Sequence, residues 1–212
     1  WSVDRDLPVV QERIFQREGR FAAGVFVGLL TSEPFYWYLP VGANLNYYFT
    51  NQLGLEIGGG FMDAEGSLTN TTELHDFLES DSSGFDATTD LEDRMLWRAH
   101  ALFVWNPLYG KWSFLNNKLT HFDANLVLGG GVVSVDRPTA DRTDNVQEIV
   151  PELVFGLGAH FLLSENWVVR ADGRFYVFPG FQSDFETDDE GEGFFGSLVI
   201  PAEFKLGVSY LF

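Results

Sequence analysis

Apolar and polar residues alternate one by one along most of the chain, a period that is typical of β-strands with one apolar face. No stretch with helical periodicity has a comparable length outside the first twenty residues. No run of about 18 apolar residues is present either, which excludes a transmembrane helix. The alternation therefore predicts about eight antiparallel strands. They are expected at 20–30, 37–49, 53–61, 95–105, 121–132, 152–161, 167–177 and 202–212.

The connections between these strands differ in length between the two sides of the predicted sheet. Tight turns are expected at 51–52 and 164–166, on the side of the N-terminus. Short periplasmic turns and long outer loops are the rule in bacterial outer-membrane barrels. Two connections depart from this rule, because 31–34 is short on the outer side and 106–118 is long on the inner side. The long outer loops are expected at 63–93, 135–147 and 179–193.

The same alternation would fit a soluble carrier of the lipocalin type, whose apolar face lies inside the barrel. The composition of the polar face favours the opposite arrangement, since it is rich in glycine, which suits a crowded barrel interior. Trp97 and Trp105 lie eight residues apart on one strand, which is about 20 Å of height on a tilted strand. That height is close to the roughly 25 Å apolar band between two aromatic girdles. The glycines are Gly24, Gly28, Gly54, Gly58, Gly60, Gly129, Gly131, Gly156 and Gly158.

These observations predict an all-β fold, namely a transmembrane antiparallel up-and-down β-barrel of about eight strands in the outer membrane of a Gram-negative bacterium. The barrel would comprise 20–212, and 1–19 would form a periplasmic arm or a plug. The chain begins at Trp1 without a basic and apolar leader, so we expect a mature or trimmed product. The terminal pattern that ends in Tyr210 and Phe212 resembles the signal by which the barrel assembly machinery recognises such barrels.

The polar face carries charges of both signs in nearly equal numbers. Charges in a dry interior are stable only when they are paired and hydrogen-bonded, so we expect a satisfied salt-bridge network. An eight-stranded barrel has room for side chains but not for an open channel, so its own residues would plug the lumen. The expected network comprises Glu56, Arg98, His100, Asp123, Glu152, Arg170, Asp172, Arg174, Glu203 and Lys205, with His121 and His160 beside it.

The composition excludes some functions. The net charge of −18 leaves no basic patch for nucleic acid, and the absence of cysteine excludes disulfides and thiolate metal sites. Carboxylates gather in 63–93 and 179–193, which contain no Lys or Arg, and clustered oxygens suit Ca²⁺. No EF-hand spacing is present, however, and such acidic loops are usually only solvated. The candidates for weak Ca²⁺ binding are Asp81, Asp86, Asp188 and Asp189, and no other cofactor is expected.

A catalytic site is not expected. Outer-membrane enzymes need a nucleophile or a paired Asp and His near the outer rim. His75 and Asp76 are the only such pair, and adjacent residues need not face each other. No Gly-x-Ser-x-Gly elbow is present.

Four consecutive aromatic residues mark the hairpin at 31–40. They would either belong to the membrane girdle or form an exposed docking surface, because large apolar patches are rarely left bare. These residues are Phe35, Tyr36, Trp37 and Tyr38.

Two stretches suggest a family. The first has the sequence VQERIF at 10–15 followed by EGRF at 18–21, and the second has NPLYGK at 106–111 followed by HFD at 121–123. In both, the chain resembles the outer-membrane β-barrel domain family that is abundant in myxobacteria and related gliding or predatory lineages. The resemblance implies the barrel fold, makes the long connection at 106–118 a family trait, and carries no active site. Small barrels of the OmpA and OmpX type are an analogy of fold, from which no function follows.

We therefore expect a non-enzymatic outer-membrane barrel with a plugged, salt-bridged lumen, acting as a structural or interaction component of the cell envelope, for example as a subunit of a larger complex. The alternative is a small-solute channel or transporter, which would need about ten or more strands or a mobile N-terminal arm. The expected partners are outer-membrane lipid and lipopolysaccharide, the barrel assembly machinery and other envelope proteins.

Overall fold

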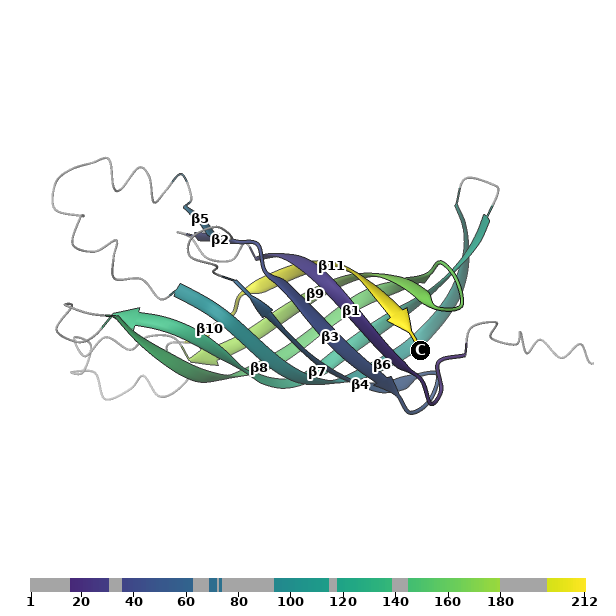
Figure 1. The fold of residues 1–212 in the computed structure, drawn as a ribbon, viewed down its shortest axis with the longest axis horizontal. Coiled ribbons are helices and arrows are strands. Elements are labelled where there is room, and N and C mark those ends of the chain that lie inside the picture. The colour runs from purple at the N-terminus through teal and green to yellow at the C-terminus, as the bar shows by residue number, and fades with distance from the viewer. Residues whose placement is uncertain are drawn as a thin grey trace, which may run out of the picture.

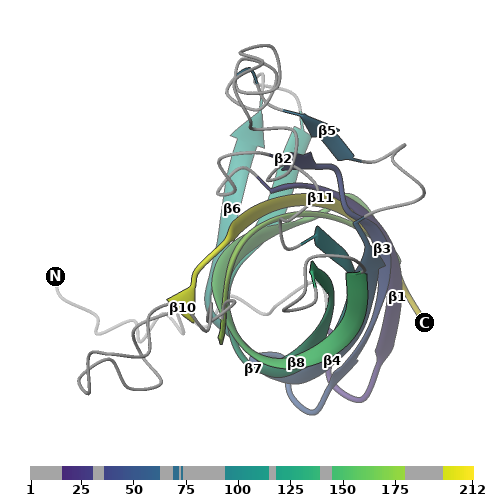
Figure 2. The same ribbon diagram turned by 90° about the vertical axis from the view of Figure 1, so that its left-hand side faces the viewer.

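The chain folds into a closed β-barrel with three short additional strands at one end (Figures 1 and 2). The computed structural model describes residues 16–30, 36–62, 69–71, 73, 94–114, 118–138, 145–179 and 198–212. The barrel strands are β1 (Phe21–Leu30), β3 (Val41–Tyr48), β4 (Leu53–Phe61), β6 (Arg94–Phe114), β7 (Lys118–Pro138), β8 (Asn145–Leu162), β9 (Trp167–Pro179) and β11 (Ala202–Leu211). The short strands β2 (Tyr36–Tyr38), β5 (Thr69–Thr71) and β10 (Leu198–Val199) lie at the end opposite to the C-terminus.

Each barrel strand pairs antiparallel with its two neighbours in the order β1-β3-β4-β6-β7-β8-β9-β11. The last strand, β11, also pairs with β1 from Ala22–Leu211 to Leu30–Glu203, which closes the sheet on itself. The prediction of an antiparallel up-and-down barrel of about eight strands is therefore confirmed. The described part of the chain contains no helix that is long and apolar enough to cross a membrane.

The two faces of the barrel wall differ as the alternation predicts. Phe103 and Phe204 point outward and are 45% and 55% exposed, whereas Arg98 and Arg174 point inward and are 3% and 2% exposed. This follows from the pleat, which sends successive side chains to opposite faces. An apolar outer belt around a polar interior is the reverse of a soluble carrier and is the arrangement of a membrane-spanning barrel.

Aromatic rings gather at the end of the barrel that carries the C-terminus. The rings of Phe21 and Tyr47 lie 4.6 Å apart, and Tyr210 lies 5.2 Å from Trp167 and 5.1 Å from Phe212. Such rings lie at the level of the lipid headgroups in membrane barrels. The short turns β3–β4 and β8–β9 are at this same end, which marks it as the periplasmic one.

The connection expected as a long inner loop at 106–118 is a β-hairpin instead. β6 and β7 remain paired from Leu108–Ala124 to Phe114–Lys118, and the hairpin projects beyond the periplasmic end of the barrel (Figure 1). The register shifts between Trp105 and Leu108, so a bulge separates the hairpin from the membrane-spanning part. Pro107 lies in this bulge, where its missing N–H is tolerated.

The outer strands are also longer than predicted. The loop expected at 135–147 is wrong at both ends, because β7 continues to Pro138 and β8 begins at Asn145. The two strands stay paired to Pro138–Asn145. In this extension the apolar side chains Val133, Val135 and Val150 lie on the inward face and are buried, so the apolar-outward alternation that marks the barrel wall does not continue there.

Tyr38 contradicts the prediction of an exposed or girdle residue. Its side chain is fully buried and packs with Leu30, Met62, Met95 and Phe178 in an apolar cluster at the outer end of the lumen. The Met95 N–H donates to the Tyr38 hydroxyl over 3.5 Å. The cause is the β2 backbone, which pairs with Leu30 of β1 and turns this ring inward.

Candidate functional site

The ten side chains that the sequence predicts as a lumen network are all buried inside the barrel. Those that share a strand lie two residues apart, because only alternate residues face the barrel axis. They come from six strands: Glu56 from β4, Arg98 and His100 from β6, Asp123 from β7, Glu152 from β8, Arg170, Asp172 and Arg174 from β9, and Glu203 and Lys205 from β11.

Glu56 is the centre of the inner half of this network. Its two carboxylate oxygens lie 2.7 Å from Arg170 Nη2 and 2.7 Å from Arg174 Nη2. Asn46 Nδ2 donates to the same carboxylate over 2.8 Å, and Arg170 Nη1 donates to Asn46 Oδ1 over 3.0 Å. One buried carboxylate thus holds two guanidinium groups.

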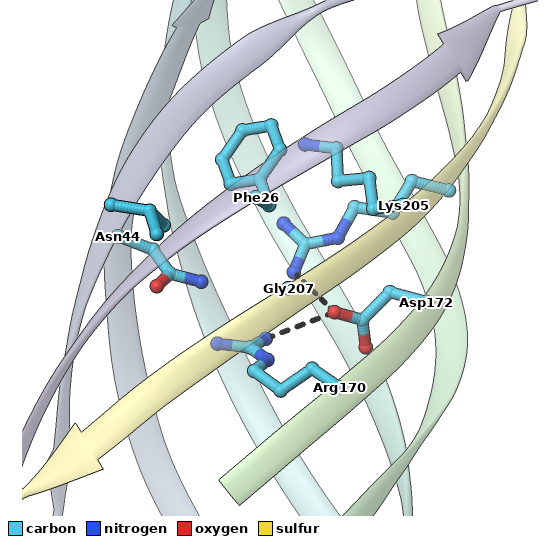
Figure 3. Close-up of a pocket in the computed structure, with 8 residues that line it drawn as sticks. Phe26, Asn44, Arg170, Asp172, Lys205 and Gly207 are labelled. Atoms are coloured by element: carbon cyan, nitrogen blue, oxygen red, sulfur yellow. Dashed lines mark ion pairs between the residues drawn. The ribbon is translucent and has the colours of Figure 1, made fainter.

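Asp172 supplies a second anion to the same two arginines. Its Oδ2 lies 3.2 Å from Arg170, an ion pair that is drawn as a dashed line in Figure 3, and 3.8 Å from Arg174. Lys205 approaches from the neighbouring β11, and its ammonium group lies 4.2 Å from the centroid of the Phe26 ring. The ring face stabilises that buried cation.

The two central histidines act as acceptors toward arginine. Arg174 Nη1 donates to His100 Nε2 over 3.2 Å, and Arg17 Nη1 donates to His160 Nδ1 over 3.3 Å. A guanidinium group has no acceptor, so the ring nitrogen that faces it must be unprotonated.

The outer half of the network is built around Glu203. Its Oε2 lies 3.4 Å from Arg98 Nη1 and 3.3 Å from Lys205 Nζ. The Tyr176 hydroxyl donates to the same oxygen over 2.5 Å. Arg98 also stacks on the Tyr176 ring, 3.5 Å from its centroid, and lies 3.6 Å from Glu152.

Arg17 is a member of the site that the sequence did not single out. Its Nη2 lies 2.9 Å from Asp123 Oδ2, and its backbone N–H donates to Asn51 Oδ1 over 2.8 Å. The guanidinium therefore enters the periplasmic end of the lumen from the segment that precedes β1. Of the segment 1–19, the structure describes residues 16–19, and the choice between an arm and a plug stays a prediction.

The buried charges of the lumen cancel. Among the described residues, five buried cations face five buried anions there. A cavity of about 10 Å³ lies between Phe26, Asn44, Arg170 and Lys205 (Figure 3), which is room for about one water molecule. The cations are Arg17, Arg98, Arg170, Arg174 and Lys205, and the anions are Glu56, Asp123, Glu152, Asp172 and Glu203.

Glycine is required where the lumen is crowded, and Gly158→Val is expected to lower the free energy of unfolding by about 1–3 kcal/mol. A Cβ at Gly158 would collide with Asp172 Oδ1 and lie 2.9 Å from the Ala171 carbonyl oxygen. Urea titration in lipid vesicles measures the loss. The control is Gly173→Val, because a Cβ at Gly173 faces outward and meets only the Leu157 carbonyl oxygen at 3.8 Å. Equal losses in both variants would contradict the crowding argument.

Tyr176→Phe tests the outer half of the network. It removes the hydroxyl that donates to Glu203 and keeps the ring that stacks on Arg98. Hydrogen bonds to charged groups contribute about 1.5–3 kcal/mol, and the unfolding free energy should fall by that amount. Tyr47→Phe on the outer face should change it by about 0.5 kcal/mol or less. If Tyr176→Phe leaves the free energy of unfolding unchanged, the hydrogen bond from the Tyr176 hydroxyl to Glu203 does not stabilise the barrel.

Several predicted residues lie outside the described part of the chain. These are the Ca²⁺ candidates, the pair His75 and Asp76, and the side chains of Phe35 and Tyr36. Trp37 is described and is exposed. Within the described residues, no group of three or more His, Asp or Glu side chains is placed to hold a metal ion. The Ca²⁺ candidates are Asp81, Asp86, Asp188 and Asp189.

No protein-family model matches the chain, and no curated protein matches it in sequence. Solved structures match its fold. The N-terminal β-barrel domain of OprF from Pseudomonas aeruginosa aligns over 92% of this chain and 98% of that chain, with 9% identity and a TM-score of 0.52. OprG from the same organism aligns over 93% and 98%, with 12% identity and a TM-score of 0.48. Ail from Yersinia pestis aligns over 92% and 99%, with 14% identity and a TM-score of 0.43.

The match to OprF concerns the fold alone. Together with the closed eight-stranded sheet and its apolar belt, it identifies the fold as that of the small outer-membrane β-barrels of Gram-negative bacteria.

Proposed function

We propose that this chain is a non-enzymatic outer-membrane barrel whose lumen is plugged by its own side chains, and that it acts as a structural or interaction component of the cell envelope. The observation that carries the proposal is the neutral lumen, in which five cations and five anions from six strands and from the segment before β1 pair with one another. A pore needs a continuous water path, and side chains occupy the axis instead.

The alternative function is a small-solute channel or transporter. It would need a wider barrel or an N-terminal arm that moves out of the lumen. Eight barrel strands and the contact of Arg17 with Asp123 both count against it. Conductance of the protein reconstituted in planar bilayers distinguishes the two functions.

In that experiment we expect no stable conductance steps at neutral pH. The matched positive control is a double variant that removes one cation and one anion from the outer half of the lumen, Arg98→Ala with Glu203→Ala, and so leaves the net charge of the lumen unchanged. It should conduct more than the unmodified chain, provided that it folds. A stable open pore in the unmodified chain would overturn the proposal of a plugged lumen.

An interaction role also implies partners. The periplasmic hairpin and the outer ends of β7 and β8 extend beyond the apolar belt and can reach other envelope proteins. Outer-membrane lipid and lipopolysaccharide would surround the belt, and the exposed Tyr210 and Phe212 would serve the barrel assembly machinery. The resemblance to the myxobacterial barrel family remains part of this proposal. Purification from native membranes, with and without residues 108–120, tests whether a companion depends on the hairpin.

A further inference from the structure

We infer that the lipid-facing wall carries a binding groove for one acyl chain of a phospholipid in the periplasmic leaflet. The groove lies on the outside of β4, β6 and β7 and has a volume of about 370 Å³, within the range of small-molecule sites. Its lining is apolar except for the indole N–H of Trp105, so the groove suits a hydrocarbon chain better than a polar ligand. The lining residues are Leu53, Phe103, Trp105, Leu126, Val127 and Leu128.

The register places the groove in the periplasmic half of the belt. Leu53 is the first residue of β4 after the short turn, and it pairs with Trp105, which pairs with Leu126. The bulge that leads into the periplasmic hairpin begins directly after Trp105. The groove therefore opens at the headgroup level of the periplasmic leaflet. Lipopolysaccharide, which occupies the outer leaflet, faces the other half of the belt.

The shape of the wall continues the groove toward the middle of the membrane. The next outward positions on β6 and β7 are Ala101 and Gly130, which pair with each other and are both exposed. Ile57 pairs with Ala101 on one side and Leu153 pairs with Gly130 on the other, and both of these larger side chains project outward. Small residues between larger ones form a narrow channel that fits an extended hydrocarbon chain.

Retention of a chain in this groove depends on packing. Leaving the bilayer for an apolar wall brings no hydrophobic gain, because lipid tails are as apolar as leucine. Van der Waals contact with a wall of matching shape is then what distinguishes a held chain from the surrounding lipid. Filling the channel should therefore abolish retention without changing the fold.

Native mass spectrometry of the full chain, extracted from native outer membranes in mild detergent, tests the inference. We expect one retained phospholipid for each barrel. Ala101→Phe should abolish it, and Ala43→Phe, an exposed position of the same type on β3, should not. If Ala101→Phe does not fold, Gly130→Leu replaces it, since a Cβ there meets only the Glu152 carbonyl oxygen at 3.4 Å. Retained lipopolysaccharide, no retained lipid, or equal retention in the two alanine variants would overturn the inference.

Fluorescence locates the retained chain. Two proteins are compared that keep only Trp105 or only Trp167, which is an exposed girdle residue on β9. Both are reconstituted in vesicles of phosphatidylethanolamine with brominated acyl chains, and are then transferred to lipid-free detergent micelles. Trp105 should stay quenched while Trp167 recovers, and Ala101→Phe should restore the Trp105 emission. Equal recovery of both tryptophans would overturn the inference, while the proposal of a plugged lumen would be unaffected.

Discussion

Glu56→Leu is expected to lower the free energy of unfolding by about 3–5 kcal/mol, because it removes one partner of a buried ion pair. The substitution leaves Arg170 and Arg174 without the carboxylate that lies 2.7 Å from each. Asp172 then remains as the anion in contact with both guanidinium groups, and one carboxylate cannot neutralise two of them. Urea titration in lipid vesicles, followed by tryptophan fluorescence, measures the loss.

Two further variants give this result its meaning. Glu56→Gln keeps the shape of the side chain and an acceptor for Asn46 but loses the charge. Its free energy of unfolding should therefore lie between that of the unmodified chain and that of Glu56→Leu. Ile57→Leu changes the next residue, which faces outward, and should alter stability by about 0.5 kcal/mol or less. If Glu56→Leu unfolds like the unmodified chain, the ion pairs do not hold the lumen together.

Ile57→Arg is expected to cost about 2–4 kcal/mol, the penalty for a cation on the lipid face at the middle of a bilayer. Ile57 is 65% exposed and lies at the centre of β4, as far from one end of the strand as from the other. The same titration in vesicles measures the effect. In detergent micelles, which admit water more easily, the difference should shrink.

The control for Ile57→Arg is Gln52→Arg, at an exposed position of the periplasmic turn before β4. Near the interface the penalty falls to about 0–1 kcal/mol. Equal costs at the two positions would mean that the outer belt does not face hydrocarbon, and the assignment of inside and outside would have to be reversed.

The inside and the outside of this barrel were predictable because a strand has a period of two. Once one residue of β9 is placed, the pleat fixes the rest, and Arg170, Asp172 and Arg174 must share the lumen. The network follows from physical necessity, since buried charges must pair. The individual partners did not follow, because they depend on the register between strands, which a single strand does not encode.

The lumen residues that the sequence does not predict lie mainly in segments where apolar and polar residues do not alternate. Arg17 precedes β1 in a segment without alternation, so nothing in its spacing indicates that it enters the lumen. Tyr38 lies in an unbroken aromatic run, where no polar neighbour marks the face. Asn46 and Tyr176 could have been found, because both lie on the inward face of their strands, but neutral side chains give a weaker signal there than charged ones.

The hairpin was missed for a different reason. The bulge at 106–107 shifts the alternation by one phase, and Pro107 suggests the end of a strand. A one-residue bulge within a strand and the end of a strand both interrupt the alternation of apolar and polar residues, so the sequence does not distinguish them. Only the resumed pairing from Leu108 onward distinguishes them.

The hairpin is a direct continuation of two strands of the barrel wall, β6 and β7. The residues from Leu108 to Phe114, at about 3.3 Å each, extend the hairpin roughly 20 Å beyond the bulge. A partner bound to the hairpin would be connected through β6 and β7 to β4 and β8, with which these two strands pair inside the membrane-spanning wall. Asp123, which lies 2.9 Å from Arg17, is in register with Tyr109 of the hairpin, so such a partner would be connected directly to the charged network of the lumen.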